Sequence, residues 1–293
     1  MAGLTESLKY NSFTAGLYNL ILNIRTTGVD GYVFVATTGR SGSESLSKIF
    51  QAADRAVCLH EPYPIMLTMP KDPSQREEYF ETRFRQRKRI NVKRSAAKYR
   101  YYVETNHQFV KNFIVPAVGE FGDKMRIVHL HRDPVKVATS FLSIDSIPGK
   151  TPTGIHYLLD PADESNRIRI VDLLNGDPAF SHDFLRCVWY WYEIETRTRE
   201  YRTRFSNVPW FSLNTEQLND EASLVAMFET LRIVYDPERL KTLVGSRENT
   251  KTALKKKKSR RIDGAQEMHD ALLARMVERY GADFWRYPQD QGL

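Results

Sequence analysis

The sequence predicts an α/β fold with a parallel sheet flanked by helices. Short apolar runs with strand character alternate along the chain with longer stretches of helical periodicity. The first run, residues 32–38 (YVFVATT), passes through a Gly/Ser-rich loop into a helical pattern, which is a strand–loop–helix unit. The 293 residues are 41% hydrophobic, which is enough for a large packed core.

The elements follow in order. Strands are expected over residues 32–38, 56–62 (AVCLHEP), 101–105 (YYVET), 125–131 (MRIVHLH) and 208–213 (VPWFSL). Helices are expected over about 5–27, 43–53, 107–122, 133–144, 183–205, 221–233 and 265–281. The helix from 133 opens with Asp133-Pro134, a helix-start signal, and the N-terminal helix should pack on the domain.

We expect a single domain over residues 1–293. Residues 30–145 form the core that is expected to bind a ligand, and a proline-interrupted segment, 146–183, has the character of a lid or substrate loop. A C-terminal helical part, 184–293, carries the basic loop 255–261 (KKKKSRR). The basic run 83–100 should be a solvated helical element, with attraction of an anionic acceptor as the alternative. The aromatic stripe 188–192 should pack in the core.

Charge and cysteine content limit the function classes. Lys and Arg total 43 against 36 Asp and Glu, and this net charge of +7 favours anionic partners. The cysteines, Cys58 and Cys187, form no disulfide or metal pattern, and Cys58 should be a small core residue. The apolar stretch 13–24 is too short to span a bilayer and lacks signal-peptide features, which leaves a peripheral membrane contact as its alternative. A cytoplasmic protein without a membrane span is therefore expected.

The loop after the first strand is not a nucleoside-triphosphate loop. With Gly42 in the position of the second Walker A glycine, Thr37 replaces the first glycine and Ser43 replaces the lysine. The loop nevertheless has the properties of an anion site. Gly39 and Gly42 allow tight turns, and the following helix offers free N–H groups. Arg40 can bind two anionic oxygens at once, and the serines add hydroxyl donors.

A second pattern points to a phosphate as well. Arg132 directly follows the strand 125–131, and Ser140 lies eight positions later (140 − 132 = 8) on the helix that begins at Asp133-Pro134. An arginine at a strand end and a serine two helical turns later can bind the same phosphate group.

The two patterns together resemble PAPS-dependent sulfotransferases. Residues 40–43 (RSGS) are similar to the family's 5′-phosphosulfate loop, and Arg132 with Ser140 is similar to its 3′-phosphate motif. The resemblance covers residues 30–145 well and the rest loosely. It implies a P-loop NTPase-like sulfotransferase fold, 3′-phosphoadenylyl sulfate (PAPS) as co-substrate, 3′,5′-ADP as product, and no metal.

The resemblance also implies which residues bind the cofactor. They are Thr38, Gly39, Arg40, Ser41, Gly42, Ser43, Glu44, Ser45, Arg132, Ser140 and, from the basic loop that would close over the 3′-phosphate, Lys256 and Lys258. Glu44 departs from the family, which usually has Thr or Ser there. Since a carboxylate repels phosphate, we expect Glu44 to turn toward a neighbouring base and Ser45 to supply the hydroxyl. Residues 215–218 (TEQL) resemble the family's late acidic signature near the adenine only weakly.

Two residues compete for the role of catalytic base, and Arg40 would carry the electrostatic role. His107 resembles the catalytic histidine of cytosolic sulfotransferases, and Glu61 resembles a Glu-Pro of carbohydrate-type members. The two could act together, and Glu104 is a further carboxylate in this region. Only one of His60 and Glu61 should reach the site, because neighbours on an extended chain face opposite sides. His129 and His131 are expected to be packed strand residues.

The sequence therefore predicts an enzyme that transfers a sulfuryl group from PAPS to a hydroxyl or amine. The expected acceptor is a small molecule such as a natural product, with carbohydrate as the alternative acceptor, and nucleic acid is not an expected partner. Two other classes compete. A P-loop kinase with a degenerate loop would depend on magnesium and prefer ATP, and a non-enzymatic polyanion-binding protein would act through the basic runs.

Overall fold

The computed structural model describes residues 12–67, 72–244 and 262–285. The chain forms two compact units: unit 1 is Met1–His131 with Tyr201–Lys255, and unit 2 is Arg132–Glu200 with Lys256–Leu293. The helix α10 (Asp183–Arg204) runs from unit 2 into unit 1.

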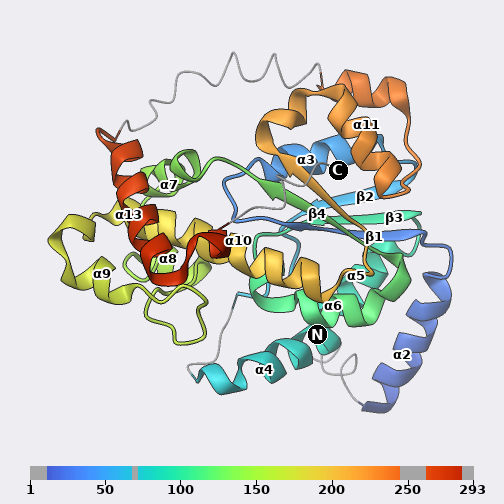
Figure 1. Ribbon diagram of the computed structural model, residues 1–293. Coiled ribbons are helices and arrows are strands. Elements are labelled where there is room, and N and C mark those ends of the chain that lie inside the picture. The colour runs from blue at the N-terminus through green and yellow to red at the C-terminus, as the bar shows by residue number, and fades with distance from the viewer. Residues whose placement is uncertain (1–11, 68–71, 245–261, 286–293) are drawn as a thin grey trace. The chain divides into compact units, whose positions relative to one another are not determined.

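Unit 1 is built on one parallel sheet. The described residues contribute five strands to it: β1 (Gly31–Ala36), β2 (Ala56–His60), β3 (Tyr101–Thr105), β4 (Met125–His131) and β5 (Trp210–Asn214). All neighbours pair in parallel, in the order β2-β3-β1-β4-β5 (Figure 1). The expectation of an α/β fold with a parallel sheet flanked by helices is confirmed.

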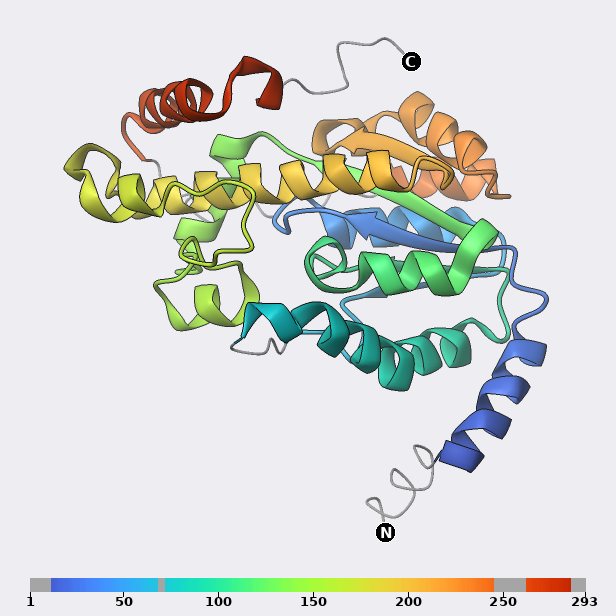
Figure 2. The ribbon, with the colours of Figure 1, turned by 60° about the horizontal axis from the view of Figure 1, so that its bottom comes forward.

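Each face of the sheet is covered by helices. Along β1, Val33 and Val35 point into a hydrophobic core that contains Leu46 of α3 (Ser43–Ile49) and Phe228 of α11 (Glu221–Thr230). Residues between them point the other way, because side chains alternate along a strand. Phe34 stacks on Phe109, with ring centroids 5.1 Å apart, in an aromatic core below η4 (Phe109–Phe113) and α6 (Ile114–Phe121). The turned view shows helices on both faces of the sheet (Figure 2).

The strand order determines where this sheet can bind a ligand. From β1 the chain continues through α3 and η1 (Phe50–Ala52) to β2 on one side, whereas β4 is followed later by β5 on the other side. In open α/β sheets, ligands bind at the carboxyl ends of the strands where the order reverses in this way. In unit 1 this place lies between the ends of β1 and β4, and the end of β3 is on the other side of β1.

The basic run differs from the expectation of a solvated element. It forms one continuous helical segment, α4 (Arg76–Arg83), η3 (Phe84–Lys88) and α5 (Arg89–Ala96), in which η3 is a π-helical turn. Lys88 is buried in this segment, and Lys93 is nearly so. They pair with Glu104 and Glu120, respectively. Two of the charges therefore belong to the interior, because each has a carboxylate to compensate its burial.

The N-terminal helix packs less fully than expected. It is α2 (Ser12–Arg25), which contacts α5 and buries Leu22. Four aliphatic side chains on α2 remain exposed: Leu17, Leu20, Ile21 and Ile24. Unit 1 also has four short 3₁₀ turns, η1 above and η2 (Pro73–Gln75), η5 (Gly122–Lys124) and η7 (Thr215–Asn219), among its described residues.

Unit 2 is helical in its described part. It contains α7 (Pro134–Ser143), α8 (Pro152–Tyr157), α9 (Val171–Gly176), η6 (Pro178–Phe180), most of α10, α13 (Ala265–Tyr280) and η8 (Ala282–Trp285). The proline-interrupted segment thus contains short helices. The aromatic stripe of α10 is core, as expected, with Trp189 and Tyr190 fully buried. Among the described helices, none combines the length and apolar character that crossing a membrane requires.

Candidate functional site

The loop after β1 is held in a strained, closed conformation. Gly39, Arg40 and Gly42 all have positive φ, of 82°, 57° and 85°. Glycine adopts such angles freely, but for arginine the left-handed region costs about 1 kcal/mol or more. The Ser41 hydroxyl is buried, donates to the Gly39 carbonyl (3.1 Å) and lies 3.0 Å from the Thr38 hydroxyl. The loop therefore curls back on itself and leaves Arg40 exposed.

Thr215 fastens this loop to the end of β4. Its hydroxyl lies 2.7 Å from the carbonyl oxygen of Ser41 and 3.0 Å from that of His131. Gly42 leaves no room for a side chain here, because an added Cβ would lie 3.1 Å from a methyl group of Leu218. Thr215 and Leu218, the first and last residues of the weak TEQL match, thus pack against the loop and hold it in place.

The helix that follows the loop begins at Ser43 with Gly42 as its N-cap. Ser43 and Ser45 are half-buried, and Glu44 is exposed. Glu44 pairs with Lys48 one turn later, at 3.3 Å. This is the neighbouring base that we expected for Glu44.

Glu61 and His107 come together although 46 residues separate them in the sequence. His60 at the end of β2 pairs with Thr105 at the end of β3, and the backbone N–H of Glu61 donates to the Thr105 carbonyl at 3.0 Å. The two strands thus present the next residues side by side. The Glu61 carboxylate lies 2.5 Å from Nδ1 of His107. The two candidate bases form one hydrogen-bonded pair.

The hydrogen bonds determine the tautomer of His107. Asn112 donates from Nδ2 to the Met66 carbonyl (2.7 Å) and to Oε1 of Gln108 (3.0 Å). The Gln108 amide nitrogen therefore faces Nε2 of His107, at 2.8 Å, and donates to it. Nε2 is then the acceptor nitrogen and Nδ1 carries the proton that is donated to Glu61.

The charges of this pair follow from its surroundings. Burial lowers the pKa of His107, helped by the nearby Lys111, and the bond to Glu61 opposes this only in part. For Glu61, burial alone would raise the pKa, but the hydrogen bond from His107 and the positive groups nearby outweigh it and the net pKa is lowered. At neutral pH the pair is a carboxylate and a neutral imidazole, as a general base requires.

A buried ion pair lies next to the Glu61–His107 pair in the interior. Lys88 of η3 and Glu104 of β3 are 2.6 Å apart and both fully buried. Lys88 also donates to the carbonyl of Pro62, the residue after Glu61, at 3.0 Å. Tyr102 and Asn106 complete the hydrogen bonds of the Glu104 carboxylate, at 2.6 and 2.9 Å. Glu104 is thus a structural carboxylate and not a further base, because its oxygens are already occupied in the interior.

Backbone strain occurs at two of the three catalytic candidates. Glu61 has φ of 47°, and Arg40 has φ of 57°. Left-handed backbone is strained for both side chains. Among the described residues it also occurs at Arg55, Met66, Asp145 and Arg232, so it does not mark the site by itself. The neighbour His60 bonds the Thr105 hydroxyl (2.9 Å), whereas Glu61 bonds His107. His129 and His131 are buried side by side on β4, as expected.

The second phosphate pattern lies in unit 2. Arg132 is the first residue after β4, and its carbonyl accepts a hydrogen bond from the Trp191 indole at 2.8 Å. The Asp133 side chain caps α7 through the Lys136 N–H at 2.8 Å, which confirms the helix start. Ser140 lies in the second half of α7, half-buried. Lys256 and Lys258 lie outside the described residues.

Sequence reasoning missed three residues of this site. Gln108 sets the tautomer of His107, and only its place next to the histidine in the sequence could have indicated this role. Lys88 could not be told apart from the other charges of the basic run 83–100. Thr215 was considered only as part of the weak match of residues 215–218 to the family's late acidic signature. No protein-family model matches the chain, and no curated protein matches it.

Proposed function

We propose that this protein is a PAPS-dependent sulfotransferase. The observation that supports it best is the Glu61–His107 pair, which forms at the carboxyl ends of β2 and β3. β3 is the direct neighbour of β1, and Val35, one residue before the end of β1, pairs with Thr105, two residues before His107. Adjacent strands are about 4.8 Å apart, so a base and an anion-type loop emerge next to each other.

The proposed reaction is an in-line displacement at sulfur. Nε2 of His107 takes the proton of the acceptor hydroxyl as its oxygen bonds to sulfur, and the bond from sulfur to the bridging oxygen of the phosphosulfate breaks. The electron pair stays on the phosphate of 3′,5′-ADP. Since Gln108 occupies Nε2 in the resting site, the acceptor hydroxyl has to replace its amide there. Glu61 stabilises the imidazolium that forms.

Arg40 and the loop provide the electrostatic part of the proposal. Charge develops on the leaving phosphate, and a fixed guanidinium with N–H donors of the loop would stabilise it without a metal. Thr38 through Ser45 are assigned to the 5′-phosphosulfate. Arg132 and Ser140, with Lys256 and Lys258, stay predicted ligands of the 3′-phosphate. A P-loop NTPase-like sulfotransferase fold and a cytoplasmic location belong to the same proposal.

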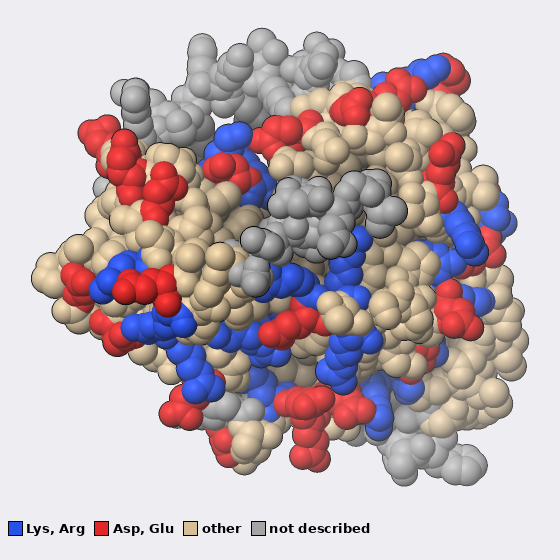
Figure 3. All heavy atoms as spheres, in the orientation of Figure 1, with Lys and Arg blue, Asp and Glu red and all other residues tan. Residues whose placement is uncertain are grey.

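The identity of the acceptor and the alternative of a polyanion-binding protein are considered next. A small molecule is the first expectation for the acceptor, and a carbohydrate is the alternative. For a polyanion binder, a broad basic surface would be expected. On the face drawn in Figure 3, the Lys and Arg side chains of the described residues lie among Asp and Glu side chains.

Replacing Arg40 by glycine tests the role of the loop. Arg40→Gly removes the charge and relieves the left-handed backbone, so the protein should keep its stability. Its affinity for 3′,5′-ADP should fall by about 10-fold or more, as loss of a charge-assisted bond predicts. Isothermal titration calorimetry measures the affinity.

Arg55→Gly is the matched control. Arg55 is also exposed with positive φ (47°), but it precedes β2 at the amino end of the sheet. This variant removes the same charge and the same type of strain, and it should bind 3′,5′-ADP like the wild type. Equal losses in both variants would show that general charge attracts the nucleotide, and an unchanged Arg40→Gly would remove the loop from the site.

A further inference from the structure

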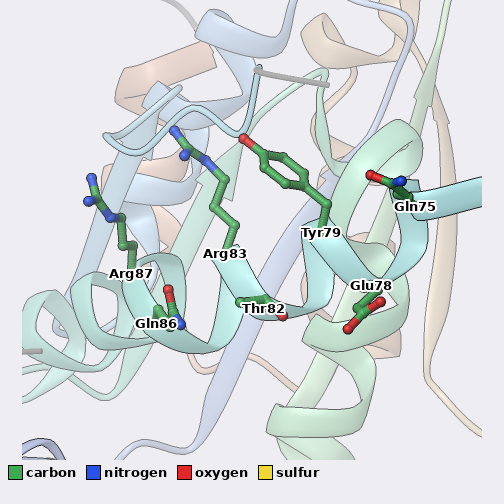
Figure 4. Close-up of a pocket in the computed structure, with 7 residues that line it drawn as sticks. All are labelled: Gln75, Glu78, Tyr79, Thr82, Arg83, Gln86 and Arg87. Carbon is green, nitrogen blue, oxygen red and sulfur yellow. The ribbon is translucent and has the colours of Figure 1, made fainter. Parts of the chain in front are cut away.

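A pocket of about 440 Å³ lies along one helix of unit 1, apart from the loop and the Glu61–His107 pair. Its walls are formed from one stretch of chain, between Gln75 and Arg87, on α4, η3 and the residue before them. Tyr79, Arg83 and Arg87 are spaced four residues apart, so they share one side of the helix. Figure 4 shows all three extending to that side, with Arg83 between the other two.

The chemistry of the lining indicates a polar, anionic ligand. Besides the three side chains above, the pocket is lined by Gln75, Glu78, Thr82 and Gln86. No aliphatic residue is among the lining residues, whereas sites for small apolar ligands are lined mainly by hydrophobic side chains. Amide, hydroxyl and carboxyl groups suit a ligand with many hydroxyls, and the two guanidinium groups suit an anionic substituent.

Arg83 is held in place without a carboxylate partner. Its guanidinium lies over the Tyr79 ring, 5.9 Å from the centroid, and in the described parts of the chain no acidic side chain forms an ion pair with it. Its Nε is buried and has no hydrogen-bond partner there. By contrast, Arg85, two residues later, pairs with Glu81. A positive charge of this kind at a pocket wall is ready to bind an anion.

The same helical segment leads from the pocket to the candidate base. Lys88, next to Arg87, binds the Pro62 carbonyl, and Asn91 donates to the Tyr63 carbonyl at 3.4 Å. These contacts attach the turn after Glu61 to the helix directly beyond the pocket. Tyr63, in this turn, is 69% exposed. The helical segment that carries Arg83 and Arg87 thus continues directly into contact with the turn that follows Glu61.

We propose that Tyr79, Arg83 and Arg87 form an acceptor-binding site for an elongated, hydroxyl-rich anion of the acidic saccharide type. The inference rests on the proposed sulfotransferase function, since it assigns this surface to the acceptor of the Glu61–His107 pair. Of the two acceptor classes named above, it selects the carbohydrate over the small molecule. The anionic group binds between the two arginines, and a hydroxyl further along the molecule lies at His107. A carboxylated and a sulfated saccharide share this chemistry, and the experiment distinguishes them.

The test compares three tetrasaccharides by calorimetry: tetragalacturonate, sulfated maltotetraose and neutral maltotetraose. The wild type should bind at least one of the two anions and bind the neutral sugar at least about 10-fold more weakly. Arg83→Gln/Arg87→Gln should lose about 10-fold or more of the anion affinity, as removal of charge-assisted bonds predicts. Arg87→Gln alone, at an exposed position, should show part of this loss and guards against a folding defect of the double variant.

Arg85→Gln is the matched control, because it removes the same charge from the same helix outside the pocket. It should change the anion affinity by no more than about 2-fold, since its exposed ion pair adds little. Equal losses in Arg85→Gln, equal binding of the neutral sugar, or no binding of either anion would overturn the inference. All variants should keep wild-type affinity for 3′,5′-ADP. If the wild type itself fails to bind 3′,5′-ADP, the proposed function fails first, and the pocket loses its role as acceptor site with it.

Discussion

At the scale of single residues, the central feature is the contact between Glu61 and His107. A histidine alone at a strand end is an ordinary structural residue, and so is a lone glutamate. Their hydrogen bond, together with the Gln108 amide on the other ring nitrogen, gives His107 one defined tautomer. This arrangement keeps a neutral Nε2 available as proton acceptor at neutral pH.

The pH dependence of stability tests the charge of His107. Its pKa is lowered by burial, so below about pH 6.5 the unfolded chain binds a proton that the folded chain does not. Stability should therefore fall as pH decreases from 7.5 to 5.5. Glu61, whose pKa is also lowered, adds stability that is lost only below its ordinary range, outside this window. Urea unfolding of wild type and His107→Gln measures the difference, and the variant should lose less stability over this window. A variant as pH-sensitive as the wild type would contradict a neutral, buried His107.

Replacing Glu61, the partner of His107, tests the same pair from the other side. Glu61 raises the pKa of His107, although less than burial lowers it. Glu61→Gln should therefore move the His107 pKa further down, and should lower turnover by about 10²-fold because the imidazolium loses its anion. A titration of the histidine ring nitrogens by NMR, with His107→Gln for assignment, reads the pKa directly. A higher His107 pKa in Glu61→Gln would mean that the two side chains do not form this pair in solution.

At the scale of elements, the helical segment α4–η3–α5 determines where Glu61 lies. Its π-helical turn carries Lys88, whose charge pairs with Glu104 in the interior and whose ammonium also binds the Pro62 carbonyl. π-helical turns are frequent at functional sites. The segment thus connects the proposed acceptor surface to the turn after Glu61 through Lys88, which also forms the buried ion pair with Glu104.

Removing one partner of that ion pair should be costly. Lys88→Met leaves Glu104 buried without a cation and should lower the free energy of unfolding by about 3–5 kcal/mol. Lys88→Met/Glu104→Gln should recover most of the loss, because no unpaired charge remains. Lys93→Met is the control: Glu120, its partner, is 18% exposed and keeps some hydration. Urea unfolding compares the three variants. If Lys88→Met costs no more than Lys93→Met, the Lys88–Glu104 pair does not hold this region together.

At the scale of the whole molecule, the strands of the sheet could be predicted because buried parallel strands have continuous apolar sequences. The loop after β1 and the start of α7 could be predicted from glycine and Asp-Pro signals. Strand order could not be predicted, and with it the contact of Glu61 with His107, because it depends on β2 pairing with β3. The burial of Lys88 could not be predicted either, since its partner Glu104 lies on a different element.

The measurement that tests the central claim most directly is a thermal-shift series with 3′,5′-ADP, 5′-ADP, and ATP with magnesium. A ligand at a hundred times its Kd adds about 2.7 kcal/mol to stability, which corresponds to a rise in Tm of about 5 °C. We expect this shift with 3′,5′-ADP and little with the other two. A shift with ATP and magnesium alone would favour a kinase, and no shift with any nucleotide would contradict the assignment of the loop to a phosphosulfate.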